Sequence, residues 1–252
     1  MKRFIRLLPL LLLVGGIFLQ AQTTPGAALP TVTVDFGRTP QGPALSATLQ
    51  TVLILTVLTL APTILVTTTC FTRIVVVLHF LRQGMGTQQT PSNQVLISLA
   101  LAMSFFVMAP VGREIYQEVL QPLERNELTI DQAMDKTAAP LKVFMLKYTR
   151  KKDLALFYSI SKRPYPETKA DVTLDVLLPA FMISELKTAF EIGFMIFLPF
   201  LIVDMVVASI LLSMGMMMLP PVVISMPFKI LLFVLVDGWH LVVGSLVKGF
   251  TG

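Results

Sequence analysis

The chain of 252 residues is 54% hydrophobic and only 14% charged. Soluble domains carry about 25% charged residues, so this composition predicts an integral membrane protein. The formal net charge is +5 and no Lys/Arg run follows the first few residues, which excludes the clustered basic face of a nucleic-acid binder. A single cysteine and two distant histidines give no basis for a disulfide, a metal site or another cofactor.

The first residues have the features of a secretory signal peptide. Three basic residues within the first six precede an apolar run from Leu7 to Leu19, and Ala21 is a plausible cleavage position. We therefore expect residues 1–21 to be a signal peptide, with an uncleaved anchor helix as the alternative. Residues 22–46 are rich in Thr, Pro, Gly and Ala, which predicts a flexible extracytoplasmic leader.

Residues 47–112 are expected to form a first helical hairpin from two apolar segments. The stretch from Leu49 to Thr69 is uncharged and, at about 20 residues, long enough to cross a hydrocarbon layer of about 30 Å as a helix. Pro62 removes one hydrogen bond from this helix, which we expect to continue through Phe71 to Leu81. The second apolar segment runs from Gln94 to Gly112.

The linker between these two segments carries positive charge only. It contains Arg73, His79 and Arg82 and no acidic residue. By the positive-inside rule, we expect a cytoplasmic basic loop that presents Arg73 and Arg82, with the mature N-terminus outside the cytoplasm.

Residues 113–175 form the one long hydrophilic region, with eleven Lys/Arg and ten Asp/Glu. By parity this region is extracytoplasmic, because long loops translocate despite their positive residues. The spacing of apolar residues between Leu141 and Phe157 is typical of a helix packed on the rest of an assembly. A solvated charged helix without a specific role is an equally good interpretation.

Residues 176–252 are expected to form a second hairpin around a methionine-rich loop, residues 213–221. Its helices are predicted from about Ala189 to Met214 and from about Val222 to Val247. Parity places the loop on the cytoplasmic side and the C-terminus outside, although Lys248 argues weakly against that orientation.

Ionisable residues interrupt the apolar segments of this second half. Such residues at membrane depth are costly, and they face the interior of a bundle, water or one another. Lys187 and Glu191 are four apart and share a helix face, whereas Asp204 needs a partner from elsewhere. Structural pairing is the favoured interpretation, over an ion relay or the lining of a conduit. The candidates are Glu185, Lys187, Glu191, Asp204, Lys229 and Asp237, of which Lys229 and Asp237 are about two turns apart and are expected to share a face.

The methionine loop has four methionines within five positions, Met214 and Met216 to Met218, and ends at two prolines. Methionine fills irregular gaps in cores, which is the ordinary interpretation. The density of thioethers at a break bounded by glycine and proline also fits a gate that seals and then adapts to varied partners.

Prolines recur within or beside the apolar segments. Broken helices at membrane depth are tolerated where they are buried in protein or line a cavity, so the pattern predicts one part of an oligomer. The residues concerned are Pro62, Pro110, Pro179, Pro199, Pro220, Pro221 and Pro227. Motifs of hydrolases, metalloproteases, P-loop proteins and dinucleotide-binding enzymes are absent from the sequence, so we do not expect an enzyme.

Several long runs together resemble the flagellar biosynthetic protein P family (FliP). They include LTLAPTIL from Leu58, LRQGMGTQQTPSNQVLI from Leu81, FMLKYTRKKDLALF from Phe144 and FKILLFVLVDGWHLVVGSL from Phe228. The longest run, PAFMISELKTAFEIGFMIFLPFLIVDMVVASILLSMGMMM, begins at Pro179. The resemblance covers roughly Leu49 to Phe250.

This resemblance implies an all-α subunit of the flagellar type III export gate, in the inner membrane at the flagellar basal body. Several copies, a pentamer in the family, form a ring or conical helical assembly with the flagellar Q and R subunits, and with FlhA and FlhB as further partners. Unfolded flagellar proteins pass through its centre. The methionine loop then closes the channel, the charged residues become inter-subunit pairs, and the predicted spans are not simple bilayer crossings.

Two alternatives remain. Injectisome export subunits look similar through the same core but usually lack the cleavable leader. An ion or solute transporter would use Asp204 as a coupling site, but the chain lacks the inverted repeats that are typical of transporters.

Overall fold

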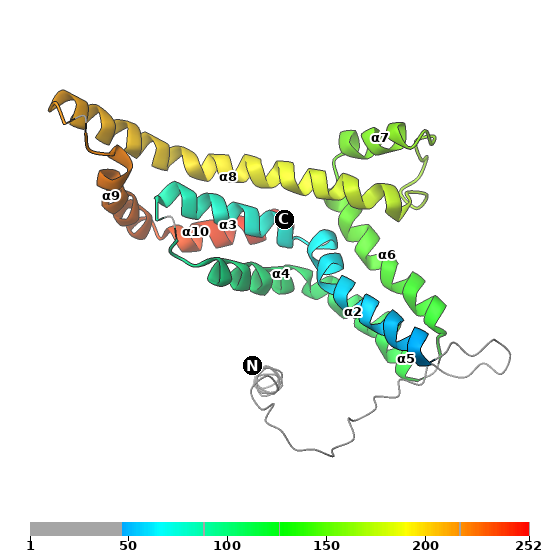
Figure 1. Cartoon of the computed structure of the whole chain (residues 1–252). Coiled ribbons are helices and arrows are strands. Elements are labelled where there is room, and N and C mark those ends of the chain that lie inside the picture. The colour runs from blue at the N-terminus through cyan, green and yellow to red at the C-terminus, as the bar shows by residue number, and fades with distance from the viewer. Residues whose placement is uncertain (1–46, 88, 126, 217, 252) are drawn as a thin grey trace, which may run out of the picture. The chain divides into compact units, whose positions relative to one another are not determined.

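The computed structural model describes residues 47–87, 89–125, 127–216 and 218–251, and every regular element within these ranges is a helix (Figure 1). The predicted signal peptide and leader, residues 1–46, lie outside the described residues.

The first two helices, α2 (Ala47–Thr68) and α3 (Phe71–Met85), are separate elements. The continuous helix expected through this stretch is wrong, because the chain bends by 71° at the break after Thr68. Hydroxyls at the end of α2 explain part of this ending: Thr68 donates to the carbonyl oxygen of Ile64 at 2.8 Å and Thr69 to that of Leu65 at 2.7 Å. Such back-bonding competes with the helical ladder and bends helices.

Helix α4 (Asn93–Ile115) contains the predicted segment and is longer than expected. Ser92 caps it, since its hydroxyl accepts a hydrogen bond from the backbone N–H of Val95 at 3.5 Å. The helix passes through a π-helical turn, Tyr116–Leu120, into the short α5 (Gln121–Glu124).

The hydrophilic region folds into α6 (Ile130–Tyr148) and α7 (Lys151–Ile160). A capping box starts α6, because the side chain of Thr129 and that of Gln132 each bond to the other's backbone N–H. Extended backbone at Thr149 and Arg150 then separates the two helices, so the helix predicted over Leu141–Phe157 is divided between them.

Helix α8 (Leu174–Ser213) is continuous for 40 residues and begins well before the predicted start at Ala189. It contains Pro179 and Pro199, so the expectation that prolines break this helix is wrong. Each proline removes one backbone hydrogen bond, and the surrounding turns and packing maintain the helix. At 1.5 Å per residue, α8 is about 60 Å long, roughly twice the thickness of a hydrocarbon layer.

The last predicted helix is also divided in two. Helix α9 (Pro221–Leu235) is followed by α10 (Gly238–Thr251), at an angle of 64°. Asp237, between them, has a positive φ of 49°, which ends the regular helix.

The core forms where α3 lies against α8 and α4. Buried side chains of α3 recur at helical spacing, among them Ile74, Val77, Leu78 and Leu81. The other helices that pack on α8 are α6, α7 and α9. Gly193 allows the close approach of α8 to α3, since a Cβ there would lie 2.6 Å from a ring carbon of Phe80.

Within the part of the chain that the structure describes, two helical stretches are long and apolar enough to cross a membrane, Asn93–Glu124 and Leu174–Ser213. The two bent pairs of helices, α2 with α3 and α9 with α10, raise the possible number to four if each pair is one span. Large apolar side chains remain exposed on α2, on the second half of α8 and on α9, which leaves much of this surface for lipid or other chains.

Candidate functional site

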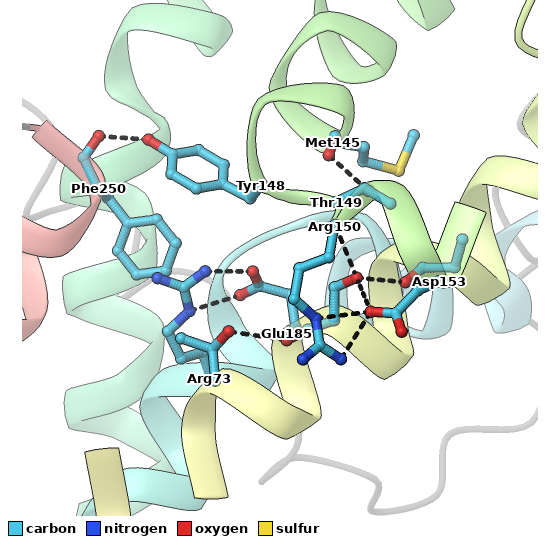
Figure 2. Close-up of polar contacts among 11 residues, drawn as sticks. Arg73, Met145, Tyr148, Thr149, Arg150, Asp153, Glu185 and Phe250 are labelled. Carbon is cyan, nitrogen blue, oxygen red and sulfur yellow. Dashed lines mark hydrogen bonds and ion pairs between the residues drawn. The ribbon is translucent and has the colours of Figure 1, made fainter. Parts of the chain in front are cut away.

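The most deeply buried ion pair joins α3 to α8. Nε of Arg73 donates to Oε2 of Glu185 at 2.9 Å, and its Nη2 donates to Oε1, so the contact is bidentate (Figure 2). Glu185 is fully buried and Arg73 is only 5% exposed. Arg73 was predicted in a basic loop; the loop is wrong, because Arg73 lies on the core face of helix α3.

The same guanidinium also contacts the C-terminal helix. Cζ of Arg73 lies 4.0 Å from the centre of the Phe250 ring, at the end of α10. The hydroxyl of Tyr148, the last residue of α6, donates to the carbonyl oxygen of Phe250 (Figure 2). Four helices, α3, α6, α8 and α10, thus meet around one charge pair. Cation–π contacts of a desolvated arginine add to the strength of such a cluster.

A second polar cluster lies one residue earlier on α8. The hydroxyl of Ser184 donates to Oδ2 of Asp153 at 2.7 Å and accepts from the backbone N–H of Arg150 at 3.1 Å. Nε of Arg150 donates to the same carboxylate oxygen at 2.7 Å (Figure 2). These contacts hold the start of α7 against α8.

The environment of Asp153 predicts a pH-dependent stability. Burial raises the pKa of its carboxyl, but the hydrogen bonds from Ser184 and Arg150 and the charge of Arg150 outweigh burial, so the pKa lies below its usual value of 3.8. A lowered folded-state pKa stabilises the protein above pH 3.8, and this stabilisation is lost as the pH falls through the folded pKa.

We therefore expect Asp153→Asn to cost about 1.5 kcal/mol of the free energy of unfolding at pH 7, because a charged acceptor is lost. The difference from the unsubstituted protein shrinks as the pH falls below 3.8. Melting temperatures in detergent across this pH range measure it, with Glu167→Gln, an exposed carboxylate in the same region, as the control. A stability deficit of the Asp153→Asn variant that stays constant with pH would contradict the assignment.

The third cluster joins α8 to α9. Nζ of Lys229 lies 2.6 Å from Oδ2 of Asp204, and the hydroxyl of Ser225 donates to Oδ1 of Asp204. The Lys229 side chain is 2% exposed and that of Asp204 is 21% exposed. The partner that the sequence required for Asp204 is therefore Lys229. The predicted common face of Lys229 and Asp237 is wrong, because helix α9 ends between them, at Leu235.

The other charged residues that the sequence singled out are half-buried or exposed. Lys187 and Glu191 are 3.2 Å apart on one face of α8, with side chains 44% and 61% exposed. Asp237 is exposed at the break before α10. Arg82, half-buried in the last turn of α3, donates to the side-chain oxygen of Asn93 at 2.6 Å and so ties α3 to the start of α4.

The methionine loop lies at the end of α8, where the chain turns into α9 (Figure 1). Gly215 allows this turn, because its φ of +73° is strained for any residue with a Cβ. Among the described methionines, Met214 is 66% exposed, Met216 41% and Met218 98%. Met217 lies outside the described residues. These exposed thioethers do not fill a core within the chain.

Two features of these clusters were missed by sequence reasoning. Ser184 and Asp153 lie in ordinary helical sequence, and Phe250 resembles any other apolar residue near the end of the chain. The sequence did single out Glu185 as a charged residue within an apolar run, but it could not identify the partner, Arg73, which is 112 residues away. Among the described residues, every buried side-chain nitrogen or oxygen has a hydrogen-bond partner.

Comparisons with known proteins agree on one family. The model of the FliP family matches residues 54–246. A flagellar biosynthetic protein FliP of Bacillus subtilis is 60% identical over 205 residues, which cover 81% of this chain and 93% of the relative. Relatives of the same name from Caulobacter vibrioides and Aquifex aeolicus are 55% and 52% identical, over 80% of this chain in each case and over 76% and 85% of the relatives.

Proposed function

The chain belongs to the FliP family, and on this premise we propose that it is a core subunit of the flagellar type III protein export gate in the bacterial inner membrane. The observation that carries this proposal is the match over residues 54–246, which includes the ion-pair clusters and the methionine loop. The three relatives all have flagellar names, which favours this function over an injectisome subunit.

In this proposal the chain is a structural and conducting component, not an enzyme. Several copies, five by analogy with the family, form a ring with the flagellar Q and R subunits, next to FlhA and FlhB and in contact with lipid. The exposed apolar faces of α8 and α9 support the proposal, since a lone chain in water would not leave them uncovered. Residues 1–21 direct the chain to the membrane and are then removed, and residues 22–46 and 113–175 lie outside the cytoplasm.

The methionine loop is the proposed gate. Each copy contributes Met214 and Met216 to Met218 to a ring of thioethers around the path of unfolded flagellar proteins. Exposure of the described methionines at a helix turn supports this role, because flexible thioethers adapt to partners of different shape.

Native mass spectrometry tests the assembly. The tagged chain is co-expressed with the neighbouring flagellar membrane subunits and extracted in mild detergent. We expect a discrete hetero-oligomer with several copies of this chain, each without residues 1 to about 21. A stable monomer or dimer with an intact N-terminus would overturn the proposal and favour a transporter.

Replacing Met216, Met217 and Met218 together by Ala tests the gate. We expect assembly at normal yield but a membrane that leaks small ions, because the shorter side chains leave the constriction open. Ion flux into vesicles that contain the assembled complex measures the leak. Met134→Ala is the control, since Met134 is 67% exposed on α6, outside the candidate spans. Unchanged permeability of assembled triple variants would count against the gate.

A further inference from the structure

An apolar cavity of about 480 Å³ lies between the bent pair α2 and α3 on one side and α4 on the other. Its wall includes Pro62 and Leu65 from α2, Phe71 from α3, Leu101 from α4 and Leu141 from α6. Both α4 and the α2–α3 pair are candidate membrane spans by length and composition.

The cavity offers little to a polar ligand. Two hydroxyls lie in its wall, and each already donates to a backbone carbonyl oxygen: Ser104 to that of Ala100 at 2.7 Å, and Thr69 to that of Leu65 at 2.7 Å. An empty apolar cavity loses van der Waals contacts on its lining. The occupant that restores these contacts without needing a hydrogen bond is a hydrocarbon.

The cavity has a volume of about 480 Å³ and an apolar lining. A flexible acyl chain can follow the cavity and fill it.

Charged residues flank the lining of this cavity: Arg113 and Glu114 lie between Gly112 and Ile115, and Lys142 follows Leu141. Arg113 follows Gly112, which lines the cavity, in the last turn of α4. Its Nε donates to the carbonyl oxygen of Ala109, another lining residue, at 3.3 Å. The exposed guanidinium therefore lies against the cavity wall, where it complements a phosphate.

We propose that this cavity binds one acyl chain of an anionic phospholipid whose phosphate group lies against Arg113. Lipid tails are as apolar as the cavity wall, so burial alone gives no preference over the bilayer. The contact with Arg113 and the filling of the cavity together hold the lipid in place. The proposal does not depend on the export function, because it concerns a single chain and its bilayer.

Two helical glycines provide a matched pair of variants. A Cβ at Gly112 or at Gly244 would have no neighbour within 4 Å, but only Gly112 lines the cavity. Leucine also favours a helix more than glycine does, so neither Gly112→Leu nor Gly244→Leu should impair folding. The full chain is delipidated in detergent and titrated with phosphatidylglycerol, and native mass spectrometry counts the bound lipids.

We expect one tightly held phosphatidylglycerol on the unsubstituted chain and on Gly244→Leu, and affinity roughly tenfold weaker for Gly112→Leu. Arg113→Gln should lower the preference for phosphatidylglycerol over phosphatidylcholine by roughly fivefold while an acyl chain still binds. Equal retention by both leucine variants would overturn the proposal. A Gly112→Leu chain that retains lipid but forms fewer oligomers in native mass spectrometry would also overturn it, because the cavity would then bind a helix of another copy.

Discussion

Replacing Glu185 by Ala is expected to lower the free energy of unfolding by about 3–5 kcal/mol. The substitution removes the carboxylate from a fully buried position and leaves the Arg73 guanidinium, 5% exposed, without its counter-charge. Burial of an unpaired charge costs far more than the loss of an exposed pair. Because the pair lies where α3, α6, α8 and α10 meet, we also expect the loss to loosen the end of α10 at Phe250.

Unfolding of the purified protein by SDS in mixed micelles measures this cost. Glu191→Ala is the matched control on the same helix: its pair with Lys187 is largely exposed, so the expected cost is below about 1 kcal/mol. The double variant Arg73→Met with Glu185→Ala should recover much of the stability, because neither charge is then left buried. Equal effects of Glu185→Ala and Glu191→Ala would contradict this account.

The variant Arg73→Lys tests whether the positive charge at this site is sufficient or whether the shape of the guanidinium group is also needed. Lysine keeps the positive charge but cannot make the bidentate contact with Glu185 or the planar stack on Phe250. We therefore expect its stability to lie between that of the unsubstituted protein and that of Glu185→Ala. A lysine variant as stable as the unsubstituted protein would show that charge alone maintains the cluster.

Replacing Asp204 by Ala is expected to have the second large effect, about 3 kcal/mol or more on stability, with a lower yield of assembled complex. Lys229, whose side chain is 2% exposed, then loses its carboxylate partner, and the hydroxyl of Ser225 keeps only the carbonyl oxygen of Val222 as an acceptor. The pair joins α8 to α9 in the hairpin that ends in the methionine loop. Its loss therefore affects the elements that position the proposed gate.

The outcome for Asp204 distinguishes structure from transport chemistry. Complex yield and ion flux are measured for Asp204→Ala, for Lys229→Met and for the double variant. We expect Asp204→Ala to be the most harmful and the double variant to recover assembly, because it leaves no unpaired charge. Lys229→Met alone should cost less, since Asp204 remains 21% exposed and keeps its bond from Ser225. Normal assembly of Asp204→Ala with lost export would instead indicate a relay.

The local sequence pattern predicted the helices correctly where a run of apolar residues is uninterrupted and is bounded by turn residues. The uncharged apolar run from Gln94 to Gly112 predicted α4, and the glycine and prolines of residues 213–221 predicted the loop between α8 and α9. The same reasoning failed at Pro179 and Pro199, because packing of α8 against its neighbours compensates for a lost hydrogen bond. It also failed at Asp237, where the chain breaks without a proline.

The sequence by itself determined that this is an apolar, all-helical protein of one family, that its methionines gather at one turn, and that its charged residues in apolar segments need partners. Composition, period and motif are local properties, and they are sufficient for those conclusions. Only the tertiary structure decided that Arg73 pairs with Glu185, that Asp204 pairs with Lys229, and that Phe250 covers the first pair. Partners 112 and 25 residues apart meet because the helices pack in one particular way, and no local pattern encodes that distance.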